Sequence, residues 1–385
     1  MKTKSSVIIL ITAIILFACS GTEKQTDPDT TNDSEIFTKT NIKYAKGFSI
    51  KVFTDFTLIE VVNPWQGADN ISFSYLLYKG NDVPKHNFNA VEIQIPIKNI
   101  VCMSTTHIGF LDKLKEIGSI AGIANIKLIN NKHLQSRINR GLVVDIGYEQ
   151  NVNYELLLEI SPDLIMSYSI GSEITGLKNK LEEFGINLSI NAEYLESHPL
   201  GKAEWIKFIA AFYDKLQMAN ELFDEIESDY LALNNLTRKI HERPTVLTGL
   251  PWKGTWYISG GQSYAAQLIK DAGAEFLWAD NISHEAIGLS IESVYEIAHD
   301  AEFWINTGAA GSLIGIEESD ERLISFRAWK NRKVFNNNAK VNTFGGNDYW
   351  ESGLVNPQII LADLIRIFHP DLSVDSNLVY YKKLK

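Results

Sequence analysis

The chain has 385 residues, of which 45% are hydrophobic, so it is long enough for two domains of ordinary size. Its formal net charge of -11 argues against a nucleic-acid backbone as a binding partner. Beyond the N-terminal segment there is no run of about 18 or more apolar residues, which excludes a bundle of membrane-spanning helices.

The N-terminal residues combine an export signal with a polar tether. Residues 1–18 have a basic start, an apolar stretch from Val7 to Phe17, and Ala18 directly before Cys19. This pattern is typical of a bacterial lipoprotein signal peptide, in which cleavage precedes the cysteine that receives the lipid. A plain secretory signal with an incidental cysteine is the alternative. Residues 19–35 are polar and predict a disordered tether. We therefore expect a periplasmic protein anchored to a bacterial membrane through Cys19.

Residues 36–96 are predicted to form a β-rich extension. β-Branched and aromatic residues fill the runs 51–54, 57–62 and 71–78, and turn-forming glycines separate these runs. We expect this segment to be an antiparallel addition in front of the first lobe.

Two similar α/β segments follow. Residues 97–213 alternate strand-like and helix-like stretches, and residues 241–385 repeat this rhythm. Alternation of this length predicts βαβ units with parallel sheets. The expected strands are Asn99–Met103, Leu142–Ile146, Leu164–Met166 and Leu188–Ile190 in the first segment, and Thr245–Thr248, Phe303–Asn306 and Lys333–Asn336 in the second.

One long helix is predicted between these segments, in residues 214–240. No Gly or Pro interrupts the stretch from Gln217 to Lys239, and apolar residues recur in it at helical spacing. These residues are Met218, Leu222, Ile226, Tyr230 and Leu233. The predicted fold class is therefore α/β, with two βαβ-type lobes around central parallel sheets, one connecting helix and the N-terminal extension. An ordinary helix inside one larger domain is the alternative.

The loops after the strands are rich in aromatic residues. Parallel sheets bind ligands at the carboxyl ends of their strands, and aromatic rings can cover a large flat ligand. Each ring has core packing as its alternative role, and His107 has a capping or surface role. The candidates for the walls of a ligand-binding cleft are Tyr148, Trp252, Trp256, Tyr257, Tyr349, Trp350 and His107.

Patterns typical of catalysis are missing from the sequence. There is no GxxxxGK[ST], GxSxG or HExxH motif, and the histidines are scattered. The two cysteines, Cys19 and Cys102, cannot form a zinc cluster, and a lipidated Cys19 leaves no disulfide. We assign no catalytic residue, no metal site and no cofactor, and expect that the protein is not an enzyme.

Short motifs between residues 97 and 372 together carry a family resemblance. They are Val144–Gly147, Asn153–Leu157, Ser161–Met166, Pro199–Trp205, Gly260–Tyr264, Asp271–Ala274, Leu289–Glu292 and Gly345–Glu351. In combination they resemble the periplasmic substrate-binding proteins of ABC importers for iron–siderophore complexes, haem and cobalamin. The resemblance implies two α/β lobes joined by a long helix, and it does not extend to the residues before about 95.

The resemblance also implies partners. In this family an exposed Glu on each lobe docks on arginines of the permease dimer, and the matching motifs place these residues at Glu155 and Glu292; a helix-dipole role is the alternative. The implied function is delivery of an iron–siderophore complex, haem or cobalamin to an inner-membrane ABC importer. The alternatives are a chelatase-like, tetrapyrrole-handling enzyme of related fold and a sensor lipoprotein without a transport role.

Overall fold

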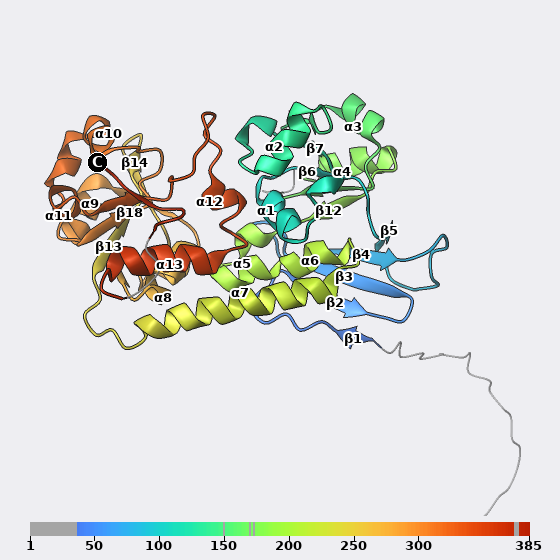
Figure 1. Ribbon diagram of the computed structural model, residues 1–385, viewed down its shortest axis with the longest axis horizontal. Helices are drawn as coiled ribbons and strands as arrows, with labels where there is room; N and C mark the ends of the chain where they lie inside the picture. The colour runs from blue at the N-terminus through green and yellow to red at the C-terminus, as the bar shows by residue number, and fades with distance from the viewer. Residues whose placement is uncertain (1–36, 149–150, 169–170, 172–173, 373–376) are drawn as a thin grey trace, which may run out of the picture. The chain divides into compact units, whose positions relative to one another are not determined.

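The computed structural model describes residues 37–148, 151–168, 171, 174–372 and 377–385, and Figure 1 shows the arrangement of their elements. The predicted lipidation site at Cys19 and the tether lie outside the described residues. Residues from Phe37 to Lys385 form one compact unit.

The N-terminal extension is a five-stranded sheet in the order β1-β2-β3-β4-β5. Its strands are antiparallel except for β4 and β5, which are parallel, so the expectation of a purely antiparallel sheet is corrected at this edge. Residues 79–90 form a crossover there instead of a tight hairpin. The sheet packs on the first lobe, where the ring of Phe48 lies 4.7 Å from that of Trp205. The strands are β1 (Thr38–Lys39), β2 (Phe48–Val52), β3 (Phe56–Val62), β4 (Ser72–Tyr78) and β5 (Val91–Gln94).

The first lobe has a central parallel sheet in the order β12-β11-β6-β7-β8. Its middle strands β6 and β11 are buried along their whole length, as expected where helices cover both faces. The strand expected at Leu142–Ile146 is shorter, because only Val144 and Asp145 pair with β7. The strands are β6 (Ile100–Cys102), β7 (Ile120–Ile123), β8 (Val144–Asp145), β9 (Gly147–Tyr148), β10 (Asn151–Val152), β11 (Leu164–Ser167) and β12 (Leu188–Ile190). The helices are α1 (Thr106–Lys113), α2 (Lys132–Asn139), α3 (Tyr154–Ile160), α4 (Ile174–Glu183), α5 (Pro199–Glu204) and α6 (Ile206–Ala211), with single turns η1 (Ile117–Ser119), η2 (Ile126–Leu128) and η3 (Glu193–Leu195).

The second lobe has the sheet order β16-β13-β18-β19-β20, in which only β20 is antiparallel. A second, antiparallel sheet β14-β15-β17 forms in a region expected to be a loop. The strands are β13 (Thr245–Thr248), β14 (Pro251–Trp252), β15 (Thr255–Ile258), β16 (Glu275–Phe276), β17 (Ile287–Ser290), β18 (Phe303–Ile305), β19 (Val334–Asn336) and β20 (Lys382–Lys383). The helices are α8 (Tyr264–Asp271), α9 (Ile291–Ala298), α10 (Leu313–Ser319), η4 (Glu321–Ser325), α11 (Arg327–Lys330), α12 (Asp348–Glu351) and α13 (Pro357–Phe368).

The long helix α7 (Leu216–Thr237) runs alongside α6 and α13 and joins the two lobes (Figure 1). Its buried face includes Ile226 and Tyr230, as the apolar stripe indicated, and also Ala219 and Phe223, while Leu222 and Leu233 of the stripe are half-buried and pack against the same core. The face that packs on the core is thus wider than the predicted stripe. None of the helices in the described ranges has the length and apolar character of a membrane span.

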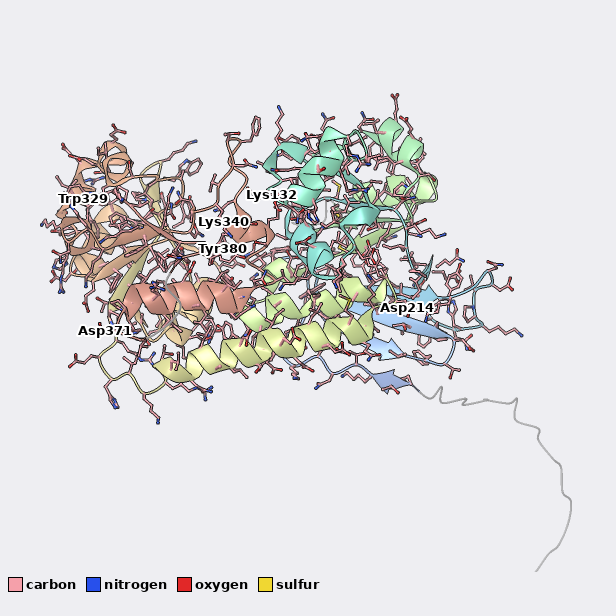
Figure 2. All side chains as sticks on the ribbon, in the orientation of Figure 1. Lys132, Asp214, Trp329, Lys340, Asp371 and Tyr380 are labelled. Atoms are coloured by element: carbon pink, nitrogen blue, oxygen red, sulfur yellow. The ribbon has the colours of Figure 1, made fainter. Side chains whose placement is uncertain are left out.

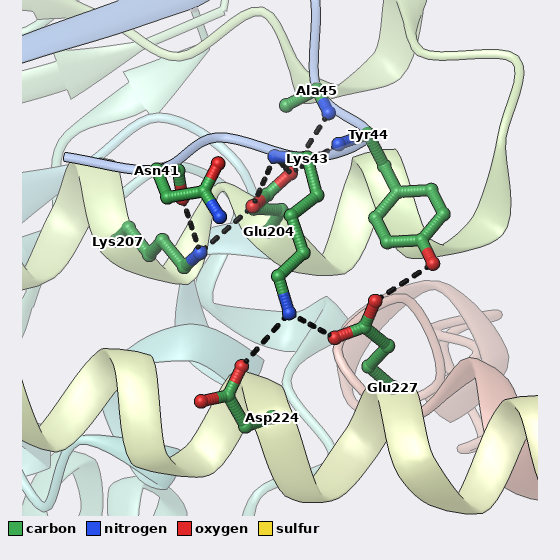
Figure 3. Close-up of polar contacts among 8 residues, drawn as sticks. All are labelled: Asn41, Lys43, Tyr44, Ala45, Glu204, Lys207, Asp224 and Glu227. Carbon is green, nitrogen blue, oxygen red and sulfur yellow. Dashed lines mark hydrogen bonds and ion pairs between the residues drawn. The ribbon is translucent and has the colours of Figure 1, made fainter. Parts of the chain in front are cut away.

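A strap of residues 41–47 ties the extension to this helical layer (Figure 3). The carboxylate of Glu204 accepts backbone N–H groups from Lys43 (2.9 Å), Tyr44 (2.7 Å) and Ala45 (2.9 Å). It also pairs with Lys207 at 2.8 Å, and both side chains are almost fully buried. A buried carboxylate therefore holds the strap through three backbone amides.

The two lobes also contact each other directly. The carboxylate of Glu351, on α12, accepts the backbone N–H groups of Asn130 (2.7 Å) and Asn131 (2.6 Å), which precede α2. The side-chain amide of Asn342 donates to the carbonyl of Ile129 at 3.1 Å. Figure 2 labels Lys132, the first residue of α2 in the first lobe, and Lys340, which precedes α12 in the second lobe.

Candidate functional site

A cavity of about 560 Å³ lies between the two lobes. Its first-lobe wall follows the carboxyl ends of β6 and β12, which is where a parallel sheet presents a ligand site. A cavity of about 730 Å³ between α7 and α13 is larger, so position rather than size identifies the site. The first-lobe wall includes Thr106, Glu193, Tyr194, Glu196, Ser197 and Lys202, and the second-lobe wall includes Ser259, Ser263, Tyr264, His284, Glu285 and Trp350.

The N-terminal extension also reaches this cavity. Gln66, in the β3–β4 connection, lines it. Glu196 lines it as well, and its Oε1 accepts the backbone N–H groups of Lys46 (2.8 Å) and Gly47 (2.9 Å) in the strap and the indole N–H of Trp205 (3.1 Å). The extension therefore contributes one residue to the wall and holds another in place.

Buried charges line the first-lobe wall. Glu193 is 1% exposed, and one of its carboxylate oxygens, Oε2, has no hydrogen-bond partner among the described residues. Burial raises the pKa of Glu193, while a hydrogen bond from Thr106 and the charge of Lys202 oppose the rise. The site therefore contains a carboxyl group with unused hydrogen-bonding capacity.

Lys202 is fixed beside this carboxyl group. Its ammonium donates to the carbonyls of Glu193 (2.9 Å) and Tyr194 (2.8 Å) and lies 5.2 Å from the ring centroid of Tyr264 on the other lobe. Burial lowers the pKa of Lys202 to about 8, against the opposing charges of Glu193 and Glu196. Its positive charge thus serves the wall itself and the contact between lobes.

The second-lobe wall begins at the turn before α8. Ser263 is the N-cap of α8, and its hydroxyl accepts the backbone N–H of Ala266 at 3.3 Å. The Nδ1 atom of His284 lies 2.9 Å from the carbonyl of Gln262 and 2.9 Å from the hydroxyl of Ser197. A second pair of side chains thereby joins the lobes at the cavity.

Of the aromatic residues expected in a cleft, Trp350 lines this cavity and is 46% exposed. Tyr148 (57% exposed), Trp252 (62%) and Tyr257 (50%) lie on the surface outside it. They are on the short strands β9, β14 and β15 and are not among the residues that line the cavity.

Three expectations for cleft residues are corrected, because the structure buries their side chains. Trp256 is 0% exposed, donates its indole N–H to the carbonyl of Thr248 at 2.9 Å and packs 5.5 Å from the ring of Trp304. Tyr349 is 2% exposed, since α12 turns it inward and turns Trp350 outward. His107 is 0% exposed on α1, and burial lowers its pKa to about 3.

The two glutamates expected at the permease interface are both exposed first-turn residues. Glu155 lies in the first turn of α3, and Glu292 in the first turn of α9. Glu292 pairs with Arg322 at 2.5 Å, and Arg322 also pairs with Asp320 at 2.6 Å. A backbone hydrogen bond and the charge of Arg322 lower the pKa of Glu292. Glu292 therefore already has a cationic partner within its own chain.

Glu193 and Lys202 were not predicted from the sequence as cavity residues. Neither residue is aromatic, although Glu193 follows the expected strand Leu188–Ile190 and so has the position of a strand-end residue. Lys202 lies inside a short helix, α5, and only the approach of the second lobe makes it a wall residue.

Comparison with known proteins places the fold in a family. The family model described as periplasmic binding protein matches residues 100–340. The chain is 26% identical to an uncharacterised lipoprotein of Methanocaldococcus jannaschii over 395 aligned positions, which cover 94% of this chain and 91% of the relative.

Solved structures agree at the level of the fold. A possible iron-binding periplasmic solute-binding protein from Staphylococcus epidermidis superposes with a TM-score of 0.55 and 18% identity, over 71% of this chain and 100% of that chain. A periplasmic haem-binding protein from Pseudomonas aeruginosa superposes with a TM-score of 0.56 and 13% identity, over 75% and 98%. The predicted two-lobed α/β fold and the predicted resemblance are confirmed. Because the family model spans more than half of the chain, this protein belongs to the periplasmic binding protein family.

Proposed function

We propose that this protein is the substrate-binding component of an ABC importer and that it holds its ligand in the cavity between the lobes. The observation that carries the proposal is the position of this cavity, which follows the ends of β6 and β12 and is lined by residues of both lobes in a chain of this family. Binding proteins for iron and haem are among its structural neighbours. The ligand classes that we propose are a ferric siderophore complex, haem or cobalamin.

The size and walls of the cavity support a small-molecule ligand. Its volume of about 560 Å³ falls within the range of about 300–1,000 Å³ that is usual for such sites. Trp350 has a solvent-accessible ring in the cavity wall, and Tyr264, the first residue of α8, also lines the cavity. The lobes are held by α7 and by the Glu351 contact, so we expect a largely pre-formed site and small movements on binding.

Anchoring and docking complete the proposal. A lipid on Cys19 would hold the protein at the outer face of a membrane, and the tether would connect it to the compact unit that starts at Phe37. Glu155 and Glu292 would contact arginines of a permease dimer, one from each lobe. Because Glu292 is paired with Arg322, docking there would require exchange of one cation for another, whereas Glu155 is the more available of the two.

Ligand titration followed by tryptophan fluorescence and native mass spectrometry tests the proposal. The purified protein would be titrated with a ferric hydroxamate, a ferric catecholate, haem and cyanocobalamin. We expect one-to-one binding of at least one of them with quenching of Trp350, because this ring lines the cavity. Trp350→Phe should remove most of the quenching, and Trp252→Phe, whose ring is exposed elsewhere, serves as the matched control. If none of the four binds, the proposed ligand classes are wrong.

A further inference from the structure

One group in the cavity wall lacks a partner that a ligand can supply. Glu193 is 1% exposed, and its Oε2 has no hydrogen-bond donor among the described residues. A buried carboxylate oxygen without a donor raises the free energy of the empty site, and a ligand that provides the donor removes this cost. Glu193 therefore favours a ligand with a donor at this position.

Lys202, the cation beside Glu193, does not remove the preference of Glu193 for a ligand with a hydrogen-bond donor. The ammonium of Lys202 already donates to two backbone carbonyls and lies over the ring of Tyr264. A lysine has three N–H donors, so at most one remains for the ligand or for Glu193. Lys202 is thus committed mainly to holding η3 and the lobe contact.

The remaining charges of the wall have the same sign as Glu193. Glu196 and Glu285 both line the cavity, and no arginine is found among the described residues that line it. Oε1 of Glu196 is already occupied by the strap, whereas Glu285 is exposed. An anionic ligand would therefore meet several carboxylates and no guanidinium.

We infer that Glu193 is a specificity-determining residue that selects ligands presenting an ammonium group or an N–H donor to the first-lobe wall, and that the cavity discriminates against ligands presenting a carboxylate there. The inference rests on the proposed function, since it concerns the ligand of the same cavity. The inference narrows the proposed ligand classes to complexes that are neutral or cationic where they meet the first-lobe wall. Charge-assisted hydrogen bonds of a buried carboxylate are stronger and more selective than neutral ones, which is why one residue has this influence.

A charge series on one chelate scaffold tests the inference. The probes are a linear ferric trihydroxamate with a free terminal ammonium, its N-acetylated form, and its succinylated form, which ends in a carboxylate. On the unmodified protein we expect affinity to fall in this order, with the ammonium form at least about tenfold tighter than the carboxylate form. Titration calorimetry at constant pH and two salt concentrations gives the dissociation constants.

Variants then assign the effect to one residue. Glu193→Gln keeps the shape of the side chain and removes its charge, so the preference should shrink to within about threefold. Glu285→Gln removes a carboxylate that lines the same cavity but is exposed, and the preference should remain. The charge series on the unmodified protein stands as a test even if Glu193→Gln does not fold.

Two results would overturn the inference and are distinguishable from each other. Equal affinity across the series, or a preference for the carboxylate form as a protonated Glu193 would produce, refutes the selection but leaves the transport function intact. If neither the hydroxamate series nor haem, its propionate diamide, a ferric catecholate or cyanocobalamin binds the protein, the proposed function fails and the inference fails with it.

Discussion

The buried ion pair beneath the strap leads to an asymmetric stability prediction. Glu204 is fully buried and holds three backbone N–H groups as well as the ammonium of Lys207 (Figure 3). Among the described residues Lys207 has two oxygen partners, Glu204 and the carbonyl of Asn41 (2.9 Å), and its ammonium lies 4.5 Å from the ring centroid of Phe223. Removal of Lys207 therefore leaves a carboxylate with three backbone donors, whereas removal of the Glu204 carboxylate leaves an ammonium with one carbonyl partner.

Glu204→Gln should destabilise the protein by about 3–5 kcal/mol, because it leaves a buried ammonium without a carboxylate and turns an amide N–H toward the strap donors. Lys207→Met should cost only about 1–2 kcal/mol, since the carboxylate of Glu204 keeps its three backbone donors and a methionine packs well on Phe223. The ranking, rather than either value alone, is the prediction.

Urea unfolding of the purified protein, followed by circular dichroism, measures both changes. Asp224→Asn is the matched control, because its 3.2 Å ion pair with Lys43 is largely exposed and should contribute about 0–1 kcal/mol. If Lys207→Met destabilises the protein as much as Glu204→Gln does, the three backbone donors do not offset the cost of burying the Glu204 carboxylate without its ammonium partner. That result would refute the reasoning.

Three further predictions concern the lobe contact, the core and the anchor. Burial raises the pKa of Glu351 to about 7, so this group ionises in the folded protein only as the pH rises above its ordinary range. Relative to Glu351→Gln, the free energy of unfolding should therefore fall by up to about 3 kcal/mol between about pH 4.5 and pH 8. Denaturation curves across this range measure the difference, and a difference that does not change with pH would contradict the prediction. Trp256→Ala should cost about 3–5 kcal/mol, because its ring is fully buried, whereas Trp252→Ala at a 62% exposed position should change stability by less than about 0.5 kcal/mol; a similar loss for both, measured by thermal unfolding, would argue against the core assignment. Cys19→Ser should move the protein from the membrane fraction to the soluble fraction after cell lysis, and an unchanged distribution on immunoblots would refute lipid anchoring.

Local patterns in the sequence predicted the alternation of strands and helices in both lobes and the connecting helix, but not β7 or the small sheet β14-β15-β17. Wholly apolar runs such as Ile100–Cys102 and Leu164–Met166 form parallel strands, since such strands are buried on both faces and show no alternation. The uninterrupted stretch around α7 became one helix from Leu216 to Thr237, within three residues of the ends expected at 214 and 240. These features depend on residues that are adjacent in the chain, so the sequence pattern is enough to predict them.

The composition of the site was decided by the tertiary structure. A strand pattern states that Trp256 and Tyr257 point to opposite faces, but only the packing of β15 on the second lobe determines that Trp256 is the buried one. Glu193 and Lys202 become wall residues because the second lobe brings Tyr264 across from them, and Glu351 reaches Asn130 across more than two hundred residues of sequence. Secondary structure follows from short-range periodicity, whereas burial, pKa shifts and the cavity arise from contacts between segments that are distant in the sequence, so no local pattern records them.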